Sequence, residues 1–287
     1  MAKSPAHRWG QIIGDVLEES FHPVFQQVAD AHGLYLDYKR KRAARKNLTV
    51  AWTDQYGNAH LLDYVLERGG SDGSLGLPVA FIETAFRRYT KHSKNKAQEI
   101  EGAVVPLADT YSYLHPFRGA ILGGVFTGNS LTQLRSRGFD IIYVPYDDIL
   151  KAFDVVNIDA SCEEETTDVD FQEKVDRWVA LSLDQRATVR AALVAVAKPQ
   201  TDTFLDALNR KLARQIQHVT VTVLHGRAQD VITVVEAIQY IEGYSATAVS
   251  EAPALKFDVQ VRYNNGDVVG GVFHDRADAI AYLKKFL

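Results

Sequence analysis

The chain has 287 residues, with 32 Lys and Arg against 36 Asp and Glu, a formal net charge of −4, 46% hydrophobic residues and one cysteine. This composition excludes collagen-like, mucin-like and wholly disordered proteins, and the length allows one large domain or two smaller ones. The single thiol, Cys162, cannot form an internal disulfide, and no Cys/His cluster has zinc-site spacing, so a cytoplasmic protein is expected. Neither a signal-peptide core nor a run of about 18 apolar residues is found, so no membrane partner is expected.

The small net charge is the sum of two opposite segments. Residues 36–96 contain 12 Lys and Arg and 6 Asp and Glu, a net charge of +6, so the rest of the chain carries −10. Residues 147–176 contain 11 acids and only two lysines. A basic segment followed by an acidic one predicts a polyanion-binding surface on the first domain and a solvated connection after it.

The first half of the chain alternates between helical and strand-like patterns. Apolar residues recur at helical spacing over 7–30 and 97–111, and a short helix is expected at 131–137. Strand-like runs occupy 34–38 or 48–53, then 60–66, 78–87, 117–127 and 139–144. The turn residues at 55–58 (QYGN) predict a hairpin. This order, αβββαβαβ, predicts an α/β domain over residues 1–153 with a central mixed sheet flanked by helices.

The second half predicts a separate α+β domain. Residues 154–170 are expected to form an acidic linker, and residues 171–287 a C-terminal domain for dimerisation or target recognition. Helices are expected at 170–182, 184–197, 201–215, 228–242 and from 275 onward, and strands at 218–224 and 256–263 with a further strand to 273. The residues Asn264-Asn265-Gly266-Asp267 predict a hairpin turn, and no internal repeat is evident.

Two acidic residues interrupt consecutive apolar strands. Asp63 lies within LLDYV, and Glu83 follows Val-Ala-Phe-Ile twenty residues later. Burying a carboxylate costs several kcal/mol unless it is paired or binds a metal. If the two strands are neighbours, both carboxylates can hold Mg²⁺ or Mn²⁺, and a cation so held supports phosphodiester hydrolysis. Each acid could instead form an ordinary salt bridge.

Basic residues flank this pair of acids. Lys and Arg supply most of the non-specific affinity of proteins for DNA. The residues expected to contact DNA phosphates are Arg87, Arg88, Lys91, Lys96, Lys39, Arg40, Lys41 and Arg42. The segment from Lys39 to Lys46 could also be a solvated loop. The Gly-rich stretch 69–76 lacks the Lys-Ser/Thr of a P-loop, so no nucleotide cofactor is expected.

With Asp63 on the second strand, Glu83 ending an apolar third strand and this order of elements, the segment from about residue 7 to 150 resembles the PD-(D/E)XK nuclease superfamily, especially type II restriction endonucleases. The resemblance implies a restriction-endonuclease-like core, with Asp63 and Glu83 as metal ligands and catalytic residues.

The chain departs from the family pattern at one position. The family has a lysine two residues after the Glu, whereas this chain has Ala85. Arg87 is next on the same strand face but cannot act as a base. Helical projection favours Lys94 as the catalytic lysine, with Lys96 and Lys91 as alternatives. The resemblance also implies a supporting acid or amide from a helix, for which the projection favours Glu19 as a further metal ligand and Gln98, with Glu99 left open.

These observations predict a Mg²⁺-dependent endonuclease that hydrolyses double-stranded DNA, of the restriction or phage-defence type. Cutting both strands requires two sites, so a homodimer is expected. The alternative is a catalytically inactive DNA-binding protein on the same fold, which Ala85 favours.

Overall fold

The computed structural model describes residues 4–45, 47–89, 93–163, 165–223, 228–245 and 256–287. The chain forms two compact units, the first comprising residues up to 111 and 116–209, the second 112–115 and 210–287. The boundary therefore lies later than the sequence analysis expected, and residues 171–209 belong to the first unit. The expected linker is also part of that unit, because Ile158, Ala160 and Cys162 are buried and the Trp9 indole donates a hydrogen bond to the Ala160 carbonyl.

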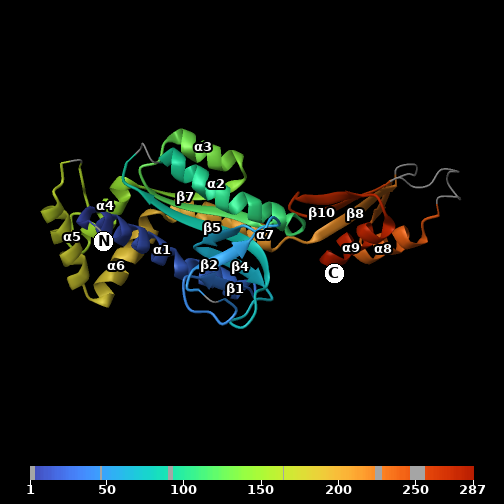
Figure 1. The fold of residues 1–287 in the computed structure, drawn as a ribbon, viewed down its shortest axis with the longest axis horizontal. Coiled ribbons are helices and arrows are strands. Elements are labelled where there is room, and N and C mark those ends of the chain that lie inside the picture. The colour runs from blue at the N-terminus through green and yellow to red at the C-terminus, as the bar shows by residue number, and fades with distance from the viewer. Residues whose placement is uncertain (1–3, 46, 90–92, 164, 224–227, 246–255) are drawn as a thin grey trace. The chain divides into compact units, whose positions relative to one another are not determined.

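The first unit is an α/β fold with a mixed five-stranded sheet of order β1-β4-β5-β6-β7 (Figure 1). β1, β4 and β5 are antiparallel neighbours, whereas β5, β6 and β7 run parallel. The strands are β1 (Tyr35–Tyr38), β4 (Tyr64–Arg68), β5 (Leu77–Arg87), β6 (Phe117–Gly124) and β7 (Phe139–Pro145). The expected hairpin at 55–58 is confirmed: β2 (Val50–Thr53) and β3 (Ala59–Leu62) form a separate antiparallel ribbon.

Helices cover both faces of this sheet (Figure 1). They are α1 (Pro5–Ala31), α2 (Ser93–Thr110), α3 (Gly128–Ser136), α4 (Tyr146–Asp154), α5 (Asp168–Ala180), α6 (Leu183–Val196) and α7 (Lys198–Leu212). On the α2 face, Phe81 and Ala85 of β5 pack in one core cluster with Ile100 and Val104. The opposite face packs against α1, α4 and α7. A Cβ added at Gly123 of β6 would meet Leu17 of α1 and Ile149 of α4. Phe117 of β6 contacts Phe204 of α7.

The start of α1 follows from its sequence. The Ser4 hydroxyl accepts a hydrogen bond from the His7 amide, and Pro5 occupies the first turn, where its missing N–H costs nothing. The buried face of α1 carries Trp9, Ile13 and Leu17 at helical spacing. Among the described residues, no helix is both long and apolar enough to cross a membrane.

The second unit is α+β, with a four-stranded antiparallel sheet of order β11-β10-β8-β9. Its elements are the 3-10 turns η2 (Ser112–Leu114) and η4 (Lys284–Phe286), strands β8 (Ile216–Val223), β9 (Ala228–Val231), β10 (Phe257–Tyr263) and β11 (Val268–Phe273), and helices α8 (Val234–Gly243) and α9 (Arg276–Leu283). The predicted Asn-Gly turn is confirmed, with Gly266 at φ +91° between β10 and β11. β9 occupies the start of the segment expected to be helical.

This unit contains an internal repeat, so the expectation of none was wrong. The order β8-β9-α8 recurs as β10-β11-α9, and both helices begin at a capping residue, Thr233 or Asp275. The helices then share an Ala-Ile-x-Tyr segment, in TVVEAIQYI (233–241) and DRADAIAYL (275–283). In the sheet, Val259 pairs with Val221 and Val261 with Val219, as a twofold relation between repeats requires. The two repeats share few identical residues, so the repeat is recognised from the order and pairing of its elements and not from the sequence alone.

Candidate active site

Asp63 occupies the break between β3 and β4. The sequence analysis expected one strand over 60–66, but the chain bends at this residue. An Asp63 side-chain oxygen, Oδ2, accepts a hydrogen bond of 2.6 Å from the Thr84 amide of β5. The carboxylate is thereby fixed beside β5, next to Glu83. Burial raises the pKa of Asp63, although the Thr84 hydrogen bond opposes the shift.

Glu83 lies on β5 between Phe81 and Ala85, on the sheet face that α2 covers. Its residue exposure is 8%, and its Oε1 atom is buried without a hydrogen-bond partner among the described residues. Burial and then the charge of Asp63 raise the pKa of Glu83 well above its ordinary value. The two carboxylates are therefore close enough to repel each other, as the sequence analysis expected.

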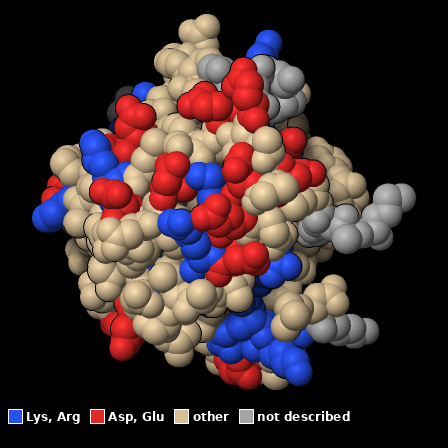
Figure 2. Space-filling model, turned by 90° about the vertical axis from the view of Figure 1, so that its left-hand side faces the viewer, with Lys and Arg blue, Asp and Glu red and all other residues tan. Residues whose placement is uncertain are grey.

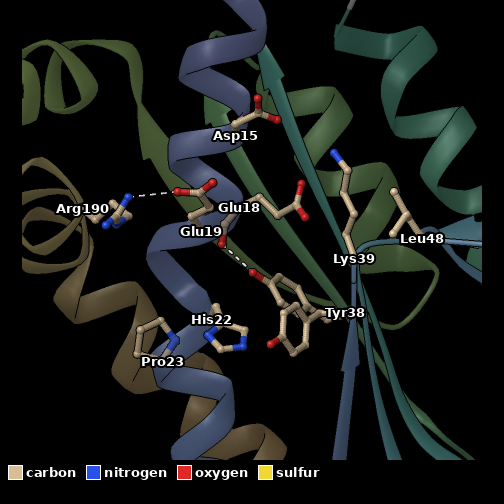
Figure 3. A pocket seen from close by; sticks show the side chains of 10 residues that line it. Asp15, Glu18, Glu19, His22, Pro23, Tyr38, Lys39, Leu48 and Arg190 are labelled. Carbon is tan, nitrogen blue, oxygen red and sulfur yellow. Dashed lines mark hydrogen bonds and ion pairs between the residues drawn. The ribbon is translucent and has the colours of Figure 1, made fainter. Parts of the chain in front are cut away.

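The third acidic group near this pair is Glu18. Burial and then the Asp63 charge raise the pKa of Glu18 to about 7. Glu19, which the helical projection favoured, points the other way and forms an ion pair of 3.0 Å with Arg190 of α6 (Figure 3). The projection was wrong because α6 packs against that side of α1 and binds Glu19 there. We call Glu18, Asp63 and Glu83 the carboxylate cluster.

The carboxylate oxygens of Asp63 and Glu83 are ligands of the kind that a hard divalent cation prefers. Among the described residues, no group of three or more His, Cys, Asp or Glu side chains is arranged to hold a metal. Mg²⁺ usually takes one or two protein carboxylates and keeps several waters. Asp63 and Glu83 fit this requirement, because one Glu83 oxygen is buried without a partner and both pKa values are raised.

Lys96, and not Lys94, is the lysine of α2 near the cluster. Lys96 lines a cavity together with Asp63, and its charge opposes the rise in the pKa of both Asp63 and Glu83. Lys94 is exposed, and Lys91 lies outside the described residues. Ala85, at the family's lysine position, is 4% exposed and packed in the core cluster.

The other supporting residues of α2 face solvent. Glu99 has a side chain that is 59% exposed and pairs with Lys96 at 3.2 Å and with Arg87 at 3.6 Å. It therefore orients two cations near the cavity and does not join the carboxylate cluster. Gln98 is exposed. The sequence analysis expected Gln98 to border the buried stripe, but α2 turns this position outward.

Two cavities meet at Glu18, and Asp63 lines one of them; Glu83 is not part of either lining. One, of about 460 Å³, is lined by one face of α1, by Asp63, by the end of β5 and by Lys96, Arg87 and Arg88. The other, of about 620 Å³, is lined by His22, Tyr38, Lys39 and Leu48 among others (Figure 3). Both are lined by Asp15 and Glu18, so they form one trough along α1.

The basic segment after β1 divides into exposed and buried residues. Lys39 and Lys41 are exposed, and in Figure 3 Lys39 extends into the trough opposite Glu18. Arg40 pairs with Asp72 at 3.0 Å and stacks on Tyr38.

The prediction that Arg42 contacts DNA is wrong, because the residue is buried. Its fully buried guanidinium pairs with Asp37 at 2.8 Å and with Glu67 at 2.5 Å. Arg45 adds a second cation on Asp37, at 2.9 Å. We call Asp37, Arg42, Arg45 and Glu67 the paired cluster.

Charges of both signs are interspersed on the face shown in Figure 2. Lys and Arg gather at its lower edge, and Asp and Glu are spread over the rest. Arg88 stacks on the rings of Tyr89 and Phe171, at 4.5 and 4.9 Å. Several of the 12 Lys and Arg residues in 36–96 are therefore engaged in internal ion pairs and ring stacks, so fewer basic side chains are available to a ligand than their number in the sequence indicates.

The chain was compared with protein-family models, curated proteins and solved structures. No family model matches the chain, and no curated protein matches it. A solved structure of a protein of unknown function, AF1548, is similar over 64% of this chain and 99% of its own, with 12% identity and a TM-score of 0.29.

Proposed function

We propose that the protein is a Mg²⁺- or Mn²⁺-dependent endonuclease that hydrolyses phosphodiester bonds of double-stranded DNA, on a restriction-endonuclease-like core. One observation carries the proposal: Asp63, at the bend before β4, is fixed beside Glu83 of β5, its charge raises the pKa of that buried acid, and Glu83 Oε1 has no hydrogen-bond partner among the described residues. Such an arrangement costs stability unless a cation offsets the charge.

The residues around the cluster have distinct roles in this proposal. Asp63 and Glu83 hold the cation, which when bound polarises the phosphodiester and lowers the pKa of a bound water. Lys96, held by Glu99 at 3.2 Å, faces the same cavity and orients the attacking water. Arg87 and Arg88 at one end of the trough, and Lys39 at the other, contact the phosphates that flank the scissile one. The exposed Lys41 adds a backbone contact.

Plasmid cleavage tests the proposal. Supercoiled plasmid is incubated with the protein and Mg²⁺, Mn²⁺ or EDTA, alongside Asp63→Asn and Glu83→Gln. Glu19→Gln is the matched control, because this acid lies one residue from Glu18 but faces Arg190. We expect cleavage that requires the metal, disappears in both cluster variants and persists in Glu19→Gln.

The alternative function predicts a different result. Binding to DNA without cleavage under either metal would overturn the nuclease proposal and favour an inactive DNA-binding protein, which the buried Ala85 supports. Cleavage that survives both Asp63→Asn and Glu83→Gln would also overturn it.

A further inference from the structure

β11 carries none of the sequence features that discourage pairing between strand edges, and among the described residues it is contacted by β10, α9 and η2. Natural sheets discourage pairing between edges with charged residues, prolines, bulges or short strands. β11 is six residues long, Val-Val-Gly-Gly-Val-Phe, without charge or proline, and it pairs with β10 in unbroken register. It is the terminal strand of its sheet.

The internal repeat provides a matched comparison. β9 is the counterpart of β11 and forms the opposite edge of the same sheet. It has only four residues. Asp230 of β9 lies opposite Thr220 of β8, and Gly270 of β11 lies in the equivalent position, opposite Gln260 of β10. The first repeat thus carries a charge where the second carries a glycine, so β11 lacks the charge that protects β9.

The ladder shows which backbone groups of β11 are not used in pairing with β10. The Tyr263 amide donates to the Asp267 carbonyl at 2.9 Å at the base of the hairpin. Because bonded and non-bonded pairs alternate along an antiparallel ladder, the N–H and C=O groups of Val268, Gly270 and Val272 point away from β10. The two valines are also 40% and 53% exposed.

We propose that β11 pairs with β11 of a second copy of this chain, antiparallel and with a twofold axis at Gly270. The strand is self-complementary about this point, because Val268 of one copy then faces Val272 of the other on both sides of the axis. The amides and carbonyls of Val268, Gly270 and Val272, which point away from β10, supply the hydrogen bonds between the two strands. Gly270 permits no larger residue, since a Cβ there would meet the Val259 carbonyl at 2.5 Å.

A charge on the exposed valine tests the interface. The full chain is measured by light scattering after gel filtration, without DNA or metal. We expect twice the chain mass of 32.0 kDa for the wild type and a single chain mass for Val272→Lys. Val235→Lys on α8, at a valine that is 49% exposed in the same unit, is the control and remains dimeric. A monomeric wild type, or a dimeric Val272→Lys, overturns the proposal.

Cysteine pairs test the register. In a bonded antiparallel pair the Cα atoms lie about 5.5 Å apart, within the range that a disulfide spans. Mild oxidation therefore links two chains of Val268→Cys/Val272→Cys, whereas either single variant stays unlinked, because its two cysteines lie roughly 13 Å apart. Linkage of both single variants, or of none, contradicts the axis at Gly270. The assay uses no nuclease activity, so this interface and the proposed function can fail separately.

Discussion

The first unit buries acidic residues in two places, and the two places differ in what surrounds them. Glu67 and Asp37 of the paired cluster are fully buried and share the Arg42 guanidinium, with Arg45 adding a second cation. Glu83 of the carboxylate cluster lies on β5, the neighbour of β4, and Asp63 lies at the bend just before β4; burial raises both pKa values, and the Asp63 charge raises that of Glu83 further. A buried acid with a complete set of partners maintains the fold, whereas one without partners is available for a ligand.

The largest expected effect is on the free energy of unfolding, and it tests whether the paired cluster maintains the fold. Arg42→Ala leaves Asp37 and Glu67 buried without their shared cation, so the free energy of unfolding falls by about 3–5 kcal/mol. Urea denaturation measures the loss. Arg40→Ala is the control, because its partner Asp72 is 62% exposed, and it costs less than about 1 kcal/mol. A loss below about 1 kcal/mol for Arg42→Ala would show that the paired cluster is not structural.

The next effect concerns the cation beside the carboxylate cluster. Lys96→Ala removes a positive charge that faces Asp63 and Glu83, and we expect the cleavage rate to fall about 100-fold, equivalent to about 2.7 kcal/mol. Lys94→Ala, two residues earlier on α2 and exposed, changes the rate less than about threefold. Single-turnover cleavage measures both. Equal losses in the two variants would mean that neither lysine acts at the cluster.

The sequence predicted the acids of the carboxylate cluster better than the residues around them. Asp63 and Glu83 interrupt apolar strands, and such a pattern depends on local chemistry alone. Glu18 was missed, and Lys96 was named only as an alternative to Lys94, because a helical projection gives the angle between side chains but not which flank of a helix faces the sheet and which faces another helix. The packing of α6 against α1 decides that, and it brings Arg190 to Glu19 from 171 residues away.

The paired cluster was missed for a related reason. Arg42 lies in a run of four basic residues and Glu67 beside Arg68, where both patterns are typical of a solvated surface. Only the return of β4 beside β1, with Leu36 opposite Leu66, encloses them. Single-sequence patterns therefore predicted most elements of the first unit correctly but not which charges the sheet would enclose.

A smaller effect distinguishes two buried glutamates on neighbouring strands. Glu83→Gln removes a charge that burial and Asp63 destabilise, so at pH 8 with EDTA we expect the free energy of unfolding to rise by about 1 kcal/mol. Glu67→Gln removes the negative charge and one of the two oxygens that accept hydrogen bonds from Arg42, and lowers the free energy of unfolding by about 2 kcal/mol. Urea denaturation of both variants measures the sign of each change. The same sign for both would remove the distinction between the clusters.

The smallest effect is the pH dependence that Glu18 confers. Its pKa is raised from 4.5 to about 7, so between these values the folded protein binds more protons than the unfolded chain, and stability falls as pH rises. Glu18→Gln removes that contribution, of the order of 1 kcal/mol, and makes the curve of unfolding free energy against pH less steep over 4.5–7, where Asp63 and Glu83 still contribute. Glu19→Gln, at a side chain that is 61% exposed, leaves this slope as in the wild type. The measurement is made with EDTA, because a cation bound at the cluster would itself favour the charged carboxylates. An equal slope in Glu18→Gln and the wild type would mean that Glu18 does not belong to the carboxylate cluster, which would then consist of Asp63 and Glu83 alone.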